Sequence, residues 1–124
     1  MSLALFSWLL VTAFFLLHEL DAMSCDEWRI FPGLRSLKPD PGRRIFVWVH
    51  LPLFVAFFWF GWHPDAEIQM IFRKVIDAFA LIHIGLHLLL RKHPENRFNN
   101  PFSWTMIVGW GVTGLLHFLV SGIA

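Results

Sequence analysis

The chain has 124 residues, of which 56% are hydrophobic and only 15% are charged, with a formal net charge of +1. Soluble domains are about 45–50% apolar and about 25% charged, and a small domain buries only about 60–70% of its chain surface. Disordered, fibrous and soluble nucleic-acid-binding classes are therefore excluded. We expect a single integral membrane domain over residues 1–124, in contact with the lipid bilayer.

Four stretches of the sequence are apolar and long enough to cross a bilayer, which takes about 20 residues. We predict an all-α fold, a four-helix transmembrane bundle, with helices at about 3–24, 45–62, 66–91 and 102–123. The first stretch does not resemble a cleaved signal peptide. No Lys or Arg precedes Arg29, and the stretch ends in polar residues from His18 to Asp21 rather than in small ones.

The connections between these helices contain turn and breaker residues. Pro39-Asp40-Pro41-Gly42 lies in the first connection and is interpreted as a turn. Pro101 stands where the last helix would start, a position that suits proline. Within the predicted helices, the small residues Gly85, Gly111 and Gly114 would let a neighbouring helix approach closely.

Basic residues are concentrated in the first and third connections. They are Arg29, Arg35, Lys38, Arg43, Arg44, Arg91, Lys92 and Arg97. Because cytoplasmic loops are enriched in Lys and Arg, we expect loops 25–44 and 91–101 in the cytoplasm and both termini outside, in an inner or plasma membrane. The basic first loop is interpreted as a topology signal that contacts lipid headgroups, and no nucleic-acid partner is expected.

Ionisable side chains inside membrane spans are costly and are functional candidates. At a rise of 1.5 Å per residue, five of them on three helices share a layer roughly 6–12 Å from the cytoplasmic helix ends. They are His18, Asp21, His50, His83 and His87. Asp77 and His117 form a second level roughly 21 Å from the same side.

Imidazole and carboxylate donors in one layer favour Zn²⁺ or non-haem iron over Ca²⁺ or Mg²⁺. His at positions i and i+4, as in His83 and His87, can bind a metal from one helix face. We therefore predict a buried metal site in the cytoplasmic half of the bundle. Its predicted ligands are His18, Asp21, His50, His83 and His87.

Glu19 and Glu27 are predicted to be acid/base groups beside this site. Glu19 is turned about 100° from His18 and would face a different neighbour. Glu27 also has a simpler interpretation as part of an interfacial cap, and both interpretations stay open. The zinc-protease motif H-E-x-x-H is excluded because Ala22 stands where the second His belongs. A metal with an open position could act on a lipophilic small molecule, and enzymatic activity is left undecided.

Other functions stay open at this point. The minimal loops and aromatic-rich surface also suit a non-catalytic accessory subunit of a larger membrane complex, or a homo-oligomer. Histidine pairs in a helical bundle would also suit a b-type haem or pigment-binding protein, although zinc or iron is favoured over haem. The histidines would otherwise only hydrogen-bond one another and the carboxylates.

Two motifs also carry a family resemblance. The chain reads His18-Glu19-Leu20-Asp21-Ala22 and then Glu27-Trp28-Arg29-Ile30-Phe31. It resembles small uncharacterised bacterial multi-pass membrane proteins of the HXXEE-motif type, and more closely a neighbouring family that reads H-E-x-D-A and then E-W-R-x-F. Asp21-Ala22 replaces the two Glu of the strict HXXEE motif. The resemblance implies a helical membrane protein with a His/acid motif, and it implies no reaction.

Overall fold

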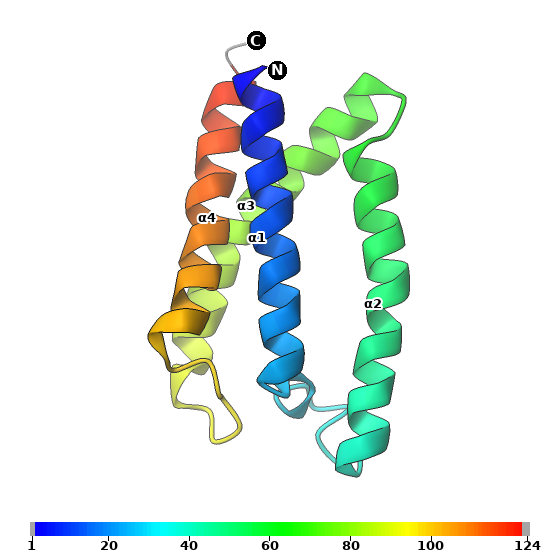
Figure 1. Cartoon of the computed structure of the whole chain (residues 1–124), viewed down its shortest axis with the longest axis vertical. Helices are drawn as coiled ribbons and strands as arrows, with labels where there is room; N and C mark the ends of the chain where they lie inside the picture. Colours follow the sequence, from blue (N-terminus) through cyan, green and yellow to red (C-terminus); the bar gives the residue numbers. More distant parts are fainter. Residues whose placement is uncertain (1, 123–124) are drawn as a thin grey trace.

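The computed structural model describes residues 2–122 as four α-helices joined by loops, which confirms the predicted all-α, four-helix fold (Figure 1). No strand occurs within residues 2–122. In chain order, with η for a short 3₁₀ helix, the elements are α1 (Leu3–Ser24), η1 (Glu27–Arg29), α2 (Pro39–Gly61), α3 (Ala66–Leu89), η2 (Leu90–Lys92) and α4 (Pro101–Ser121).

Three of the four helices begin at a side chain that caps them. Ser2, Asp65 and Asn100 accept a hydrogen bond from a backbone N–H in the first turn of α1, α3 and α4, at 3.2, 2.9 and 2.8 Å. Each of these bonds satisfies an N–H group that has no partner inside the helix. Pro101 follows its cap as the first residue of α4, as predicted.

α2 begins at Pro39, about six residues before the predicted start at 45. The interpretation of residues 39–42 as a turn is wrong, because proline suits the first turn of a helix, where its missing N–H would have no partner. Asp40 supports this first turn by pairing with Arg43 at 3.2 Å and with Arg44 at 2.9 Å. The predicted end of the last helix, residue 123, lies outside the described residues.

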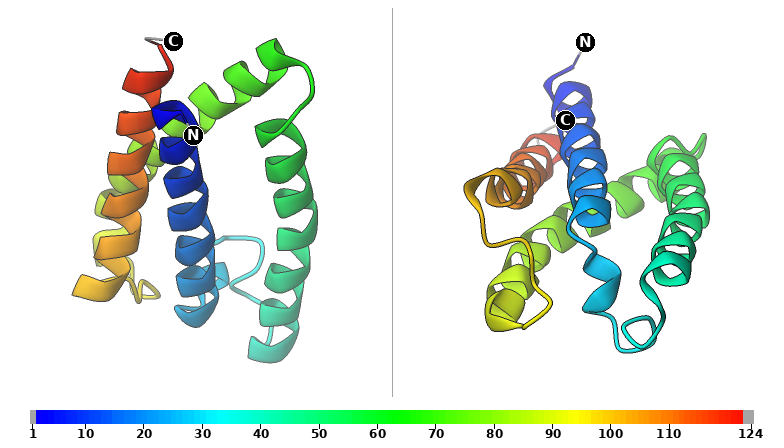
Figure 2. Two further views of the ribbon diagram at one scale, coloured as in Figure 1. Left: turned by 45° about the horizontal axis from the view of Figure 1, so that its top comes forward. Right: turned by 60° about the horizontal axis from the view of Figure 1, so that its bottom comes forward.

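The four helices run between the same two ends of the molecule. α1 and α4 lie side by side, α3 crosses behind α1 at an angle, and α2 stands apart from α4 (Figures 1 and 2). The start of α1 and the end of α4 meet at one end of the bundle (Figure 1). The loops after α1 and before α4 lie at the other end, where Arg97 donates to Asp26 at 2.7 Å.

Small residues bring α3 and α4 into close contact. A side chain added at Gly114 would lie 3.2 Å from both the Ala80 Cβ and the Asp77 carbonyl oxygen, and one at Gly111 would lie 3.4 Å from the Ala80 carbonyl oxygen. The predicted close approach at Gly111 and Gly114 is thus confirmed. The same prediction is wrong for Gly85, since no other atom lies within 4 Å of a Cβ built there.

The interior of the bundle is aromatic, and its outer surface is apolar as well. Phe57 of α2 stacks on Trp8 and Phe15 of α1, with ring centroids 5.6 and 4.4 Å apart. Outside, Trp48 and Leu89 are 70% and 79% exposed, two of many large apolar side chains on the surface. An apolar surface of this extent suits a lipid surrounding rather than water.

Three helices, α1, α2 and α4, are long and apolar enough to cross a membrane. α3 is equally long, but its first half contains Glu67, Arg73, Lys74 and Asp77. The chain therefore has the helices of a membrane protein. The fourth crossing, by α3, stays a prediction.

Replacing Gly114 with Leu is expected to lower stability by about 1–3 kcal/mol, the usual cost of overpacking. The rigid backbone of α3 at Asp77 leaves no room for the new side chain. Gly85→Leu is the matched control, because that position faces open space and Leu favours a helix more than Gly does. Thermal unfolding in detergent measures both, and equal melting temperatures for the two variants would contradict the contact.

Candidate metal centre

Three histidines on α1 and α3 face one another inside the bundle. His18 of α1 and His87 of α3 are 1% and 5% exposed, and His83 is half-buried. His83 and His87 are one turn apart, so their side chains project from the same face of α3. The packing of α1 against this face of α3 brings His18 next to His83, which lies 65 positions later in the chain.

The Nε2 atoms of the three rings converge. The Nε2 atom of His83 lies 2.8 Å from that of His18 and 3.0 Å from that of His87. One ligand atom from each ring lies within 4.8 Å of the other two. These three histidines are the group of possible metal ligands found within residues 2–122, and Asp21 and His50 lie outside it.

Proton counting makes this geometry unusual for neutral histidines. A neutral imidazole carries one N–H, and its other nitrogen offers a single lone pair in the plane of the ring. The Nε2 atom of His83 can therefore make one well-directed hydrogen bond, whereas two Nε2 atoms face it. The Nδ1 atoms of His18 and His83 are buried without a partner among the described residues, so Nε2 makes all polar contacts of these two rings.

Aromatic side chains enclose the three histidines. The Trp110 ring lies almost parallel to His18, with centroids 6.0 Å apart, and Phe98 meets the His87 ring edge-on at 4.7 Å. Trp110 and Phe98 are both 1% exposed. These rings shield His18 and His87 from water, and electrostatic interactions in such surroundings are stronger than in water.

His50 of α2 lies outside the cluster and binds Glu19 of α1. Its Nε2 atom lies 2.7 Å from Glu19 Oε2, and its Nδ1 atom lies 2.6 Å from the carbonyl oxygen of Phe46. The carbonyl can only accept, so Nδ1 donates to it. The second contact then needs another proton, held either on Nε2 or on the Glu19 carboxyl. Glu19 thus faces a different neighbour from His18, as predicted.

Asp21 lies on the same face of α1 as His18, one turn nearer the loop. It is 8% exposed, and its Oδ2 atom is buried without a partner within residues 2–122. Its Oδ1 atom lies 3.8 Å from the thiol of Cys25, which donates to it. Burial and nearby carboxylates raise the pKa of Cys25, so the thiol keeps its proton.

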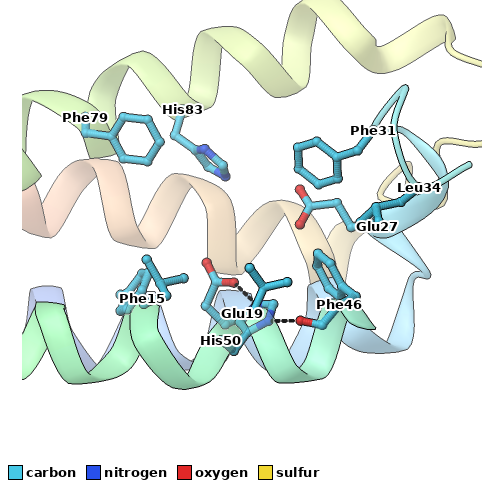
Figure 3. Close-up of a pocket in the computed structure, with 11 residues that line it drawn as sticks. Phe15, Glu19, Glu27, Phe31, Leu34, Phe46, His50, Phe79 and His83 are labelled. Atoms are coloured by element: carbon cyan, nitrogen blue, oxygen red, sulfur yellow. Dashed lines mark hydrogen bonds and ion pairs between the residues drawn. The ribbon is translucent and has the colours of Figure 1, made fainter. Parts of the chain in front are cut away.

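A cavity of about 420 Å³ lies beside the cluster, between α1, α2, α3 and the loop that follows α1. His83 forms part of its wall, so one histidine borders both the cluster and the cavity. Glu19 and Glu27 point into it, opposite His83 (Figure 3). The other lining residues are Phe15, Phe31, Leu34, Phe46, Val49, His50, Leu53 and Phe79.

Glu27, in the short helix η1, faces this cavity and has an altered acidity. Burial, followed by repulsion from Glu19 and Asp21, raises the pKa of Glu27 to about 7. Every cause acts in the same direction, so no cation among the described residues compensates the charge of this carboxyl. Glu27 thus lies in the cavity wall, and its acid/base role stays a prediction.

A second polar pair lies between α3 and α4. His117 donates from Nδ1 to the Asp77 carboxylate at 2.6 Å, and the two residues are 2% and 0% exposed. The prediction that they share a level is confirmed by this contact. The pair does not join the histidine cluster.

Comparison with known proteins identifies the family. A model of a family of unknown function, DUF6713, matches residues 4–123. The chain belongs to the DUF6713 family. No curated protein and no solved structure matches it. Membership of DUF6713 supports the prediction of an uncharacterised family, while the resemblance to HXXEE-type proteins stays a prediction.

The structure separates the predicted site residues into two neighbouring groups. His18, His83 and His87 converge, whereas His50 and Glu19 form a pair in the wall of the cavity. The depth of each residue along its helix could not separate these groups, because it does not say which helices face each other. The rotation of Glu19 away from His18 was the one sequence signal for the second group.

Glu27→Gln is expected to stabilise the metal-stripped protein, increasingly so from pH 5 to pH 8. A Glu with its pKa raised from 4.5 to about 7 favours folding when protonated, and that stability is lost as the pH rises through about 7. The expected gain in the free energy of unfolding is at most about 3.5 kcal/mol, at about 1.4 kcal/mol per pKa unit. Thermal unfolding at several pH values measures it, with exposed Glu67→Gln as control. A gain in melting temperature that does not depend on pH would contradict the raised pKa of Glu27.

Proposed function

We propose that this protein binds a metal ion, zinc or non-haem iron, on His18, His83 and His87. The observation that supports it is the convergence of three Nε2 atoms from two helices. A metal ion accepts the lone pairs of all three nitrogens at once, which hydrogen bonds between neutral rings cannot do. Nitrogen donors of this kind suit zinc and iron.

The distances are close to those that a metal requires. In a tetrahedral site with Zn–N bonds of about 2.05 Å, neighbouring nitrogens lie about 3.3 Å apart. The observed separations of 2.8 and 3.0 Å would need to widen by only a few tenths of an ångström.

Asp21 supplies a second argument for a cation. A buried carboxylate oxygen without a partner is costly, and a nearby positive charge offsets that cost. We therefore keep Asp21 as a further ligand or as the group that balances the metal charge. His50 is not a ligand in this proposal, because it forms a hydrogen-bonded pair with Glu19. A three-histidine site leaves a coordination position open, where a metal can activate water or polarise a bound oxygen.

The wild-type protein is expected to carry about one zinc or iron per chain when it is purified without chelators. His83→Ala and His87→Ala should each reduce this to a tenth or less, because two nitrogens cannot hold the ion in competition with buffer. His63→Ala and His93→Ala are matched controls, since these histidines lie in connections outside the cluster. Elemental analysis by mass spectrometry measures all five proteins.

Two results of this experiment would contradict the proposal. One is a wild-type protein without stoichiometric metal, and the other is metal that persists when both His83 and His87 are replaced. An absorption spectrum of the same sample distinguishes haem, which would give a Soret band. Isolation of the chain only within a larger complex would favour an accessory subunit.

The proposed topology has four crossings, with loops 25–44 and 91–101 in the cytoplasm and both termini outside. It is supported by the basic residues of these loops and by their position at one end of the bundle (Figure 1). α3 would then cross with Asp77 buried at 0% exposure and with Arg73 and Lys74 half-buried.

Single cysteines test this topology in a Cys25→Ser background, which leaves no other thiol. A membrane-impermeant maleimide applied to intact cells should label Ala66→Cys, at the exposed start of α3. Ser36→Cys and Asn99→Cys should react only after lysis, because their loops face the cytoplasm. A protein whose α3 does not cross would show Ala66 and Asn99 on the same side.

A further inference from the structure

The cavity beside the metal centre has two kinds of wall. Phe15 and Phe79 lie at one end, Phe31 and Phe46 lie at the other, and the polar groups point between them (Figure 3). Its volume of about 420 Å³ is within the range of ligand-binding pockets, about 300–1,000 Å³. An apolar pocket with a few convergent polar groups is the usual form of a small-molecule site.

The mouth of the cavity faces the apolar surroundings of the bundle. Val49 and Leu53 of α2, Phe79 of α3 and Phe31 of the loop line the cavity and are also 42–51% exposed. A molecule dissolved in the bilayer would therefore meet the cavity directly. Its apolar part would lie on these side chains.

The polar wall of the cavity can both donate and accept hydrogen bonds. Glu19 and His50 share a proton across a 2.7 Å contact, because both ring nitrogens of His50 face oxygen atoms. Burial raises the pKa of Glu27, opposite them, to about 7, so its carboxyl can hold a proton near neutral pH. This wall can give a hydrogen bond to an oxygen and can take one from a hydroxyl group.

From this cavity we propose a binding site for a lipid-soluble molecule that has an uncharged oxygen head, an alcohol or a carbonyl, held between Glu27 and the Glu19–His50 pair. This inference rests on the proposed function, and it specifies the kind of lipophilic small molecule that would bind beside the metal. His83 lies in the same cavity wall, so the head would lie next to the metal centre.

Charged head groups fit this site less well. A fatty acid would bring a carboxylate to Glu19 and Glu27, where burial and repulsion from Glu19 already raise the pKa of Glu27. An ammonium group could only donate hydrogen bonds, so it could not accept one from this wall, and the proposed metal at His83 would repel it. A neutral oxygen avoids both penalties and uses donors as well as acceptors.

Photo-crosslinking of the purified protein in lipid nanodiscs tests the proposal. The probes are three C16 chains that carry a diazirine and differ only in their head, which is an alcohol, a carboxylic acid or a primary amine. The alcohol should label the peptides around Leu53 and Phe79 at least fivefold more than the other two. Leu53→Trp, which fills the cavity, should reduce this labelling at least fivefold, and Leu119→Trp on the outer face of α4 should not.

Val49→Trp fills the same cavity and replaces Leu53→Trp if that variant does not fold, as judged by its melting temperature and gel filtration. Equal labelling by the three probes, or a preference for the acid or the amine, overturns the head-group assignment. Labelling that Leu53→Trp and Val49→Trp leave unchanged overturns the site itself.

Metal is measured on the same samples, before and after treatment with a chelator. Metal without cavity labelling overturns this inference and leaves the metal proposal standing. Cavity labelling without metal overturns the metal proposal and leaves the binding site standing. The two failures can therefore be told apart.

Discussion

The constraint on which this structure depends is that polar side chains inside an apolar bundle need partners, and three of these contacts join different helices. Lipid offers no hydrogen bonds, so each buried histidine or carboxylate must be satisfied within the protein. His18 on α1 meets His83 on α3, His50 on α2 meets Glu19 on α1, and His117 on α4 meets Asp77 on α3. These contacts join all four helices.

The contacts also explain the shape of the bundle. α3 and α4 pack closely because glycines face Ala80, whereas α2 stands apart and is held to α1 by a polar pair and by stacked aromatic rings. A helix that packs less closely leaves space beside it, and that space is the cavity between α1, α2 and α3. The cavity is therefore a direct consequence of the loose packing of α2.

Helix number and most helix ends followed from local chemistry, which is why they could be predicted. Apolar length defines a helix in a membrane, and Asp65 and Asn100 mark two of the starts. The start of α2 was missed because Pro39 can open a helix as readily as it can form a turn. The site was predicted only in part, because depth along a helix is local whereas the facing of helices depends on the whole packing. Gly85 shows the same limit, since its small size did not reveal that it faces open space.

His18 and Glu19 show how one helix serves two kinds of chemistry. They are neighbours in sequence, but the turn of about 100° between them directs His18 toward α3 and Glu19 toward α2. His83 completes the arrangement from α3, because it lies in the cluster and also in the wall of the cavity. A metal on the cluster and a molecule in the cavity would thus meet at His83 without sharing their other contacts. This separation lets the acids of the cavity hold protons while the histidines offer lone pairs, which a single mixed cluster of five ligands would not allow.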